Sequence, residues 1–207
     1  MKYDSIGFDL DGTLWNSIES VTEAWVETAR KYNMPEPTVE DMTGVMGLNK
    51  INLMKKLYPE LDFDTQMRFF EDSVAICDEI ISKKGGKLFD GLVEALTELK
   101  KHFKLYIVSN CQDGYIETFL RFYNLEDFFC DTENPDERCL SKGENIKSVL
   151  QRNGFKNSIF VGDTQGDADA AKFAGIPFIY ASYGFGKVDS PDFTISSLSE
   201  IADIVTK

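Results

Sequence analysis

Histidine is nearly absent from this sequence, with one residue among 207. Zinc sites and catalytic histidine pairs need more than one imidazole, so both kinds of chemistry are excluded. The single residue, His102, ends the lysine-rich segment 100–102, where a neutral or positive side chain suits the C-terminal end of a helix. Any catalysis by this chain must therefore use carboxylates, hydroxyls, amides and lysine.

Cysteine is also scarce, and the four cysteines share no C-x-x-C spacing. A chain of this length holds its core without disulfides, so we expect reduced thiols. None of them precedes an arginine at the distance that a cysteine-dependent phosphate loop requires. The pair Gly186-Lys187 continues into Val188, so a P-loop is absent as well. The four residues are Cys77, Cys111, Cys130 and Cys139.

The sequence also has few positively charged residues and no long apolar run. The chain has 22 Lys and Arg against 35 Asp and Glu, a net charge of -13. Nucleic acids and anionic membranes need clustered basic residues, so neither is an expected partner. No apolar run approaches the roughly 20 residues that span a bilayer, and residues 1–4 lack a signal-peptide pattern. We expect a cytoplasmic protein, with a monomer as the default state, that can still bind a small anion where positive charge is concentrated.

Short apolar segments that end at polar residues alternate with helical patterns along most of the chain. This alternation predicts an α/β fold with a parallel sheet covered by helices on both faces. Functional groups in such sheets gather at the carboxyl ends of the strands. The predicted strands are 2–8, 104–108, 158–161 and 177–181, with weaker candidates at 128–130 and 193–195. The predicted helices are 92–103, 115–123, 144–152 and 168–174.

The segment 16–86 interrupts the alternation, because it contains helical patterns and no convincing strand. One helix is expected to start at Asn16, which has Glu19 three residues later. Two more are expected at 49–58 and from Asp64 to the glycine pair at 85–86. We interpret 16–86 as an all-helical cap inserted into an α/β core made of 1–15 and 87–207.

An acidic string follows the first predicted strand: Phe8-Asp9-Leu10-Asp11-Gly12-Thr13-Leu14. Side chains two residues apart on an extended segment emerge on the same side, so Asp9 and Asp11 can face one pocket. Gly12 permits a sharp exit from the strand. The alternative is that the two acidic residues only terminate a turn.

This string and three later segments resemble the motifs of the haloacid dehalogenase superfamily of phosphohydrolases, in the same order. The later segments are Val108-Ser109-Asn110, then Lys142, then Gly162-Asp163-Thr164-Gln165-Gly166-Asp167. The helical insertion resembles the subclass with an α-helical cap, which contains phosphoglycolate phosphatases and β-phosphoglucomutases. The resemblance covers nearly the whole chain and implies a Rossmann-like core.

The resemblance implies catalytic roles for the acidic residues. Asp9 is expected to attack phosphorus and form a phosphoaspartate, and Asp11 to protonate the leaving alcohol and later activate water. A Mg²⁺ cofactor is expected on Asp9, the backbone carbonyl of Asp11 and Asp163. Asp167 is expected outside this ligand set, where it orients a ligand water or Lys142.

The resemblance also implies a set of groups that bind the substrate phosphate. These are Thr13, Ser109, Asn110 and Lys142. Lys147 is an alternative to Lys142, because the residue after Lys142 is glycine where the family often has proline.

Together these observations predict a magnesium-dependent phosphatase for a small phosphorylated metabolite of the phosphoglycolate, sugar phosphate or nucleotide type. The loop 43–50 resembles the family's substrate-specificity loop. Lys50 is either a ligand for an anionic leaving group or a surface lysine at a helix start. Two alternatives remain: a phosphoryl-transfer mutase, although the cap has no histidine, and a non-catalytic phosphate-binding regulator, although Asp9 and Asp11 are both intact.

Overall fold

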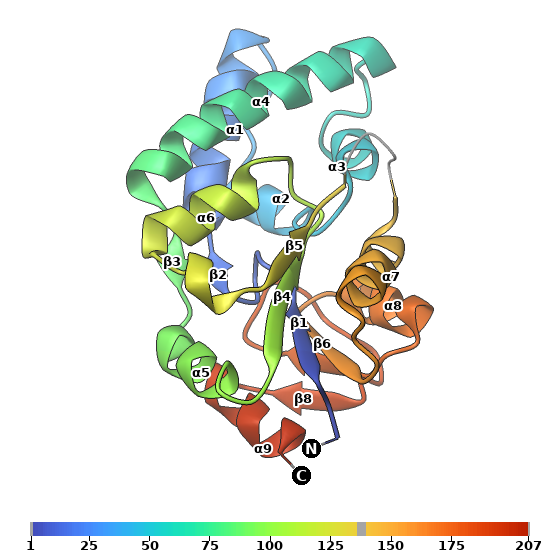
Figure 1. The fold of residues 1–207 in the computed structure, drawn as a ribbon. Coiled ribbons are helices and arrows are strands. Elements are labelled where there is room, and N and C mark those ends of the chain that lie inside the picture. The colour runs from blue at the N-terminus through green and yellow to red at the C-terminus, as the bar shows by residue number, and fades with distance from the viewer. Residues whose placement is uncertain (1, 136–139, 207) are drawn as a thin grey trace.

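Six parallel strands form the central sheet of the protein, whose computed structural model describes residues 2–135 and 140–206. They are β1 (Ser5–Phe8), β4 (Lys104–Val108), β5 (Asp131–Glu133), β6 (Ser158–Gly162), β7 (Phe178–Ala181) and β8 (Phe193–Ile195). Their order is β5-β4-β1-β6-β7-β8, so β1 lies between β4 and β6 (Figure 1). Phe8 of β1 pairs with Ile107 of β4 and Val161 of β6. The carboxyl ends of these three strands therefore lie side by side.

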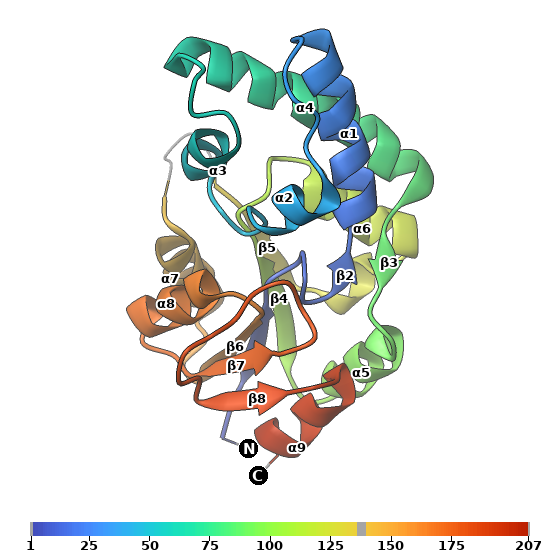
Figure 2. The same cartoon turned by 180° about the vertical axis from the view of Figure 1, so that it is seen from behind.

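Helices lie on both faces of the sheet, which confirms the predicted α/β fold class (Figure 2). They are α5 (Leu92–Leu99), α7 (Lys142–Asn153), α8 (Gln165–Ala174) and α9 (Ile201–Val205), with a 3-10 turn at Leu198–Glu200. Ile146 of α7 and Ala171 of α8 pack with Phe160 of β6 in one apolar cluster. Leu96 of α5 and Ile201 of α9 belong to the other. Each face of the sheet thus has its own apolar layer.

Four helices within residues 18–84 form a separate layer above the carboxyl ends of the strands (Figure 1). They are α1 (Ile18–Lys31), α2 (Val39–Thr43), α3 (Lys50–Leu57) and α4 (Phe63–Lys84). Trp25 of α1 packs on Phe69 of α4, with ring centroids 5.7 Å apart. The sequence did not predict α2, because five residues are too few to show a helical period. No helix within the described ranges is long and apolar enough to cross a membrane.

Two short strands join the helical layer to the core. They are β2 (Trp15–Asn16) and β3 (Lys87–Leu88), which pair antiparallel. A Cβ at Gly86 would lie 2.7 Å from the carbonyl oxygen of Asn16, so this close crossing requires glycine. The hydroxyl of Tyr123, at the end of α6 (Tyr115–Tyr123), donates to the carbonyl of Gly86. The predicted division at 16–86 passes through this pair, and we propose that the pair is the hinge of the cap.

The structure corrects the weak strand predicted at 128–130. Residues Glu126–Phe128 form a 3-10 turn, and the edge strand follows at Asp131–Glu133. The ring of Phe129 packs against that of Phe8, with centroids 6.2 Å apart, so this apolar run contributes to the core below the sheet edge and not to a strand. The strand itself is polar, and Arg152 pairs with Asp131 and Glu133 along it. A strand of three polar residues shows no hydrophobic pattern, so the sequence did not predict β5 at this position.

The first cap helix begins at Ile18 with Ser17 as its N-cap residue, and the Asn16 side chain accepts a hydrogen bond from the Ile18 amide at 3.1 Å. The predicted N-cap, Asn16, therefore lies one residue before the observed one. The thiols of Cys77, Cys111 and Cys130 are free, as expected, whereas Cys139 lies outside the described residues.

Candidate active site

Asp9 extends β1 by one residue beyond its end. Its amide donates to the Val161 carbonyl at 2.8 Å, which fixes the backbone against β6. The chain then turns sharply, and the amide of Leu14 donates to the Leu10 carbonyl. Gly12 has a φ of +87°, and a Cβ there would lie 2.3 Å from Oδ2 of Asp163. The predicted glycine exit is therefore also the point where the backbone meets the Asp163 carboxylate.

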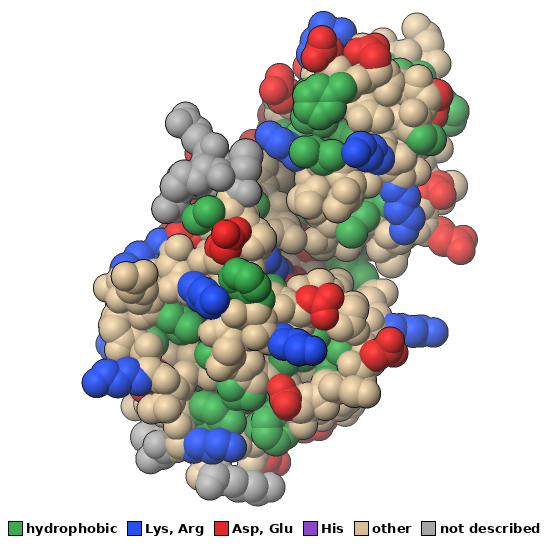
Figure 3. Space-filling view, turned by 90° about the vertical axis from the view of Figure 1, so that its right-hand side faces the viewer, with side chains coloured by type: hydrophobic (Ala, Val, Ile, Leu, Met, Phe, Trp, Pro, Cys, Tyr) green, Lys and Arg blue, Asp and Glu red, His purple; other side chains and the backbone are tan. Residues whose placement is uncertain are grey.

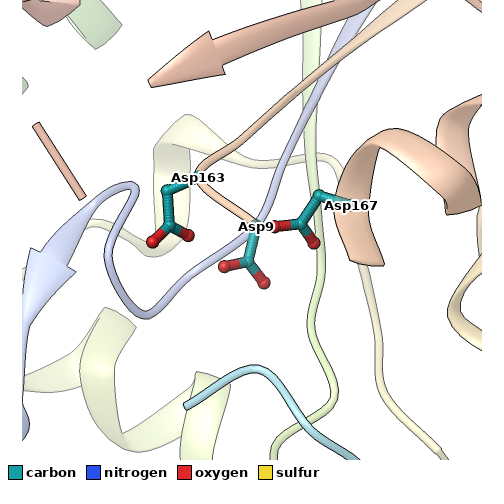
Figure 4. Close-up of side chains that lie close together, drawn as sticks. All are labelled: Asp9, Asp163 and Asp167. Atoms are coloured by element: carbon teal, nitrogen blue, oxygen red, sulfur yellow. The ribbon is translucent and has the colours of Figure 1, made fainter. Parts of the chain in front are cut away.

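Three buried carboxylates converge beside this turn (Figure 4). One oxygen from each of Asp9, Asp163 and Asp167 lies within 4.8 Å of the others. Burial raises the pKa of Asp9 above its ordinary value although Lys142 lowers it, and Asp167 and Asp163 raise it further. Burial also raises the pKa of Asp163 to about 7, with Asp167 as the second cause. The cluster therefore holds more negative charge than its surroundings compensate.

Lys142 is the buried cation of this cluster. Its ammonium group pairs with Asp9 and, at 2.5 Å, with Asp167. Burial alone would lower the pKa of Lys142, but Asp167 and Asp9 raise it above its ordinary value. Lys147 is exposed instead, with Nζ 4.1 Å from the ring centroid of Phe173. The structure thus places Lys142, and not Lys147, beside Asp9.

Both carboxylate oxygens of Asp167 have hydrogen-bond partners, and one of these partners is Lys142. Oδ1 faces Lys142, and Oδ2 accepts hydrogen bonds from the amide and hydroxyl of Thr164 at 3.0 and 2.7 Å. This second contact is a capping box at the start of α8. Asp167 thus contacts Lys142 with one oxygen and the start of α8 with the other, as expected for a residue that orients the lysine.

Asp163 is held by backbone and hydroxyl donors. Its Oδ2 accepts from the amide of Phe185 at 2.6 Å, and its Oδ1 lies 3.4 Å from the Thr13 hydroxyl. Thr13 is fully buried, and the Tyr183 hydroxyl donates to its carbonyl at 2.9 Å. The hydroxyl predicted to bind substrate phosphate therefore points toward Asp163 in this structure. Neither Phe185 nor Tyr183 was predicted, because both lie in a loop without a motif.

The carboxylate cluster fits Mg²⁺. The donors are all oxygens, which hard divalent cations prefer, and one or two carboxylates suffice when waters and phosphate complete the shell. Only two of the three buried carboxylates pair with the Lys142 ammonium group, and among the described residues Asp163 is left without a cation, so a further cation is electrostatically favourable. Asp9, Asp163 and the backbone carbonyl of Asp11 are the groups that would hold it.

Asp11 lies in a separate environment under the cap. Its Oδ1 accepts from the Ser17 hydroxyl at 2.5 Å and lies 3.0 Å from the Tyr115 hydroxyl. Burial raises the pKa of Asp11 to about 6, although these two hydrogen bonds oppose the rise. Ser17 and Tyr115 were not predicted as site residues. Ser17 lies within what the sequence suggested was only a helix start. Tyr115 is more than 100 residues from Asp11 along the chain, so no local pattern connects them.

The predicted phosphate donors on β4 meet the cap. Ser109 is buried directly after β4, and its hydroxyl oxygen lies 3.3 Å from the amide of Cys111. The Asn110 side-chain amide donates to the Gly47 carbonyl of the predicted specificity loop at 2.9 Å. Gly47 has a φ of +79°, a conformation that favours glycine. The loop therefore touches the core through its backbone, at the residue expected to bind phosphate.

A cavity of about 90 Å³ lies between the cap and these core residues. Asp9, Asp11, Ser109 and Asn110 line its core side. Lys50 is exposed and lines both this cavity and a larger groove beside α7 and α8. Figure 3 shows a hollow between the helical upper part and the lower part of the molecule, with acidic and basic side chains mixed over the same face. Five of the predicted residues therefore line one partly open cavity, and Lys142 lines the groove beside it.

Buried carboxylates and a lysine gather at the carboxyl ends of parallel strands and are covered by helices, which is where the functional groups of α/β enzymes collect. The family model of haloacid dehalogenase-like hydrolases matches residues 6–181, and the chain belongs to this family. The resemblance seen in the sequence motifs is confirmed.

Individual relatives align along nearly the full chain. The phosphoglycolate phosphatase of Vibrio vulnificus (strain CMCP6) is 26% identical over 220 residues, which cover 97% of this chain and 95% of that protein. The pyrophosphatase PpaX of Halalkalibacterium halodurans is 25% identical and covers 99% and 98%. A solved structure of a haloacid dehalogenase-like family hydrolase from Streptococcus pneumoniae matches with a TM-score of 0.85 at 23% identity, covering 99% of both chains.

Magnesium is expected to stabilise the fold more at pH 7.5 than at pH 5. The Asp163 pKa rises from 3.8 to about 7 on folding, so without metal this residue's contribution to stability falls as pH rises between those values. The cation binds the ionised carboxylates and offsets that loss. At about 100 times its Kd, Mg²⁺ should raise the Tm by about 5–10 °C at pH 7.5 and much less at pH 5. Thermal melts of the native chain and Asp163→Asn test this, and an equal rise in both chains would contradict it.

Proposed function

We propose that this chain is a magnesium-dependent phosphatase that hydrolyses a small phosphomonoester in the cytoplasm through a phosphoaspartate on Asp9. The pairing of buried Asp9 with Lys142, next to Asp163 and apart from Asp11, carries the proposal. Two carboxylates with different partners suit different roles, one as nucleophile and one as acid and base. The names of the relatives, phosphoglycolate phosphatase and pyrophosphatase, support phosphate release as the reaction.

In the first step, a carboxylate oxygen of Asp9 attacks phosphorus and the bond from phosphorus to the alcohol oxygen breaks. Asp11 donates a proton to that oxygen, so a neutral alcohol leaves. Lys142 and the Ser109 hydroxyl stabilise the charge on the transferring phosphoryl oxygens. Bound Mg²⁺ would neutralise charge on Asp9, Asp163 and the phosphate. The cap excludes bulk water while the alcohol is present.

In the second step, Asp11 takes a proton from water, and that water attacks the phosphorus of phosphoaspartate. The bond between phosphorus and the Asp9 oxygen breaks, which releases phosphate and restores the carboxylate. Asp11 must therefore be protonated before the first step and ionised before the second. A pKa near 6, raised by burial, keeps both forms accessible close to neutral pH.

Removal of the Tyr115 hydroxyl is expected to slow ester hydrolysis by an amount that depends on the leaving group. Tyr115→Phe loses one of the two hydroxyl groups that hold Asp11, so proton donation to the alcohol weakens. We expect kcat/KM, which reports the steps up to release of the alcohol, to fall about tenfold for an alkyl phosphate and much less for 4-nitrophenyl phosphate, whose leaving group needs no proton. Steady-state kinetics with both esters measure the difference.

Tyr58→Phe is the matched control, because the Tyr58 hydroxyl donates to the Pro35 carbonyl within the cap at 2.9 Å, away from Asp11. The control should leave both rates unchanged. Equal losses for both esters in Tyr115→Phe would show that Tyr115 supports the fold and not the acid.

The proposed reaction is tested by phosphate release from a panel of small phosphomonoesters, with Mg²⁺ and with a chelator. We expect magnesium-dependent release from at least one ester. Isomerisation of a sugar phosphate without phosphate release would favour a mutase instead. Binding of phosphate without turnover of any ester would favour a regulator.

A further inference from the structure

The cap side of the cavity is apolar. The residues that line it come from α1, α2, α4 and the loop before α3, and include Val21, Trp25, Met42, Val45, Phe70 and Val74. Polar groups on this side are already engaged: the Ser73 hydroxyl donates to the Phe69 carbonyl at 2.9 Å. An apolar wall of this kind gains free energy from burying carbon and offers no donor to an anion.

The only basic side chain among the described residues that line the cavity is Lys50, and it lies at the edge. Lys50 is exposed and also lines the outer groove, so its ammonium group stays hydrated. The core side of the cavity carries Asp9 and Asp11, neither of which offers a positive charge to a second anion next to the phosphate. A carboxylate on the leaving group would lose its water against the apolar wall without gaining a buried cation.

The cavity is also small. Its volume of about 90 Å³ is less than the roughly 150 Å³ of an apolar protein cavity that admits benzene. Gln112, whose amide nitrogen lies 3.4 Å from Asp78, is the neutral polar group at its side. The space therefore suits a compact group of a few carbon atoms with at most a neutral polar substituent.

We propose that the preferred substrates are phosphate esters of small, uncharged, mainly apolar alcohols, and that carboxylate-bearing esters such as phosphoglycolate are poor substrates. This inference rests on the proposed phosphatase function and adds the chemical class of the leaving group. It separates this chain from the activity in the names of the phosphoglycolate phosphatase relatives.

Isobutyl phosphate and 2-phosphoglycolate form a matched pair, because their leaving groups have the same branching and differ mainly in the carboxylate. We expect kcat/KM for isobutyl phosphate to exceed that for phosphoglycolate by about tenfold or more in the native chain. Val74→Lys, which adds a cation to the apolar wall, should reverse the preference. A higher kcat/KM for phosphoglycolate in the native chain would overturn the inference.

Lys50→Ala separates the apolar wall from the edge lysine. If the wall determines specificity, the ratio of the two kcat/KM values stays within about threefold of the native ratio, as it should in Lys55→Ala on the same helix. If Lys50→Ala alone removes activity toward phosphoglycolate, the anion is bound and the inference fails. A lack of magnesium-dependent release from both esters and from 4-nitrophenyl phosphate would refute the proposed function itself, which is a different outcome.

Discussion

Asp9→Asn is expected to reduce kcat on the order of 10⁴-fold or more, which is the scale of nucleophile removal in enzymes that form covalent intermediates. The amide has the shape of the carboxylate but cannot attack phosphorus or balance a divalent cation. The fold should persist, because the change removes one negative charge from a cluster with too few cations and leaves Lys142 paired with Asp167. Phosphate release and a thermal melt on the same sample measure both effects.

Asp169→Asn provides the control for this loss. Asp169 is exposed on α8 and accepts a hydrogen bond from the Gln165 side chain at 2.9 Å, outside the buried cluster. Activity should be unchanged in this variant. Retention of a tenth or more of native activity in Asp9→Asn would show that another group attacks phosphorus.

Lys142→Met is expected to damage stability and activity together. Loss of one partner from a buried ion pair typically costs about 3–5 kcal/mol, because the remaining charges are left uncompensated. Asp9 and Asp167 would face each other without the ammonium group, so the Tm should fall by about 10 °C. At a temperature where the variant is folded, kcat should fall about 10²–10³-fold from lost stabilisation of the phosphoryl oxygens.

The pH dependence of this variant distinguishes charge from packing. Protonated carboxylates need no counterion, so the stability lost in Lys142→Met should shrink as the pH falls from 8 to 5. Lys147→Met, five residues along the same helix, should melt and turn over like the native chain. A loss that is constant across this pH range would indicate that the lysine contributes packing alone.

Local sequence signals predicted the parts of the fold whose composition matches their burial. The strands at 104–108 and 193–195 are as predicted, because most of their residues are apolar and polar residues follow. The edge strand β5 was predicted a few residues too early. Its own residues are polar, and they are held by ion pairs with Arg152 of α7, which no local pattern reveals. The two-residue strands β2 and β3 were missed, since a single pair of residues shows no period.

The site residues also separate into those that local sequence predicted and those that it did not. Asp9, Ser109 and Asp163 each follow a strand, so parallel pairing with a common register brings them together. Contacts made across the cap have no local signal. The contact of Tyr115 with Asp11, the contact of Asn110 with Gly47 and the apolar wall opposite Asp11 all depend on how two separate layers meet.

The most direct test of the nucleophile is a rapid-quench measurement on Asp11→Asn with 4-nitrophenyl phosphate and Mg²⁺. This leaving group departs without a proton, whereas hydrolysis of the intermediate needs the base that the variant lacks. The account predicts a burst of one nitrophenol per chain, followed by slow turnover, with the phosphoryl group found on the peptide that contains Asp9. A steady rate without a burst, or a phosphoryl group on any other residue, would contradict it.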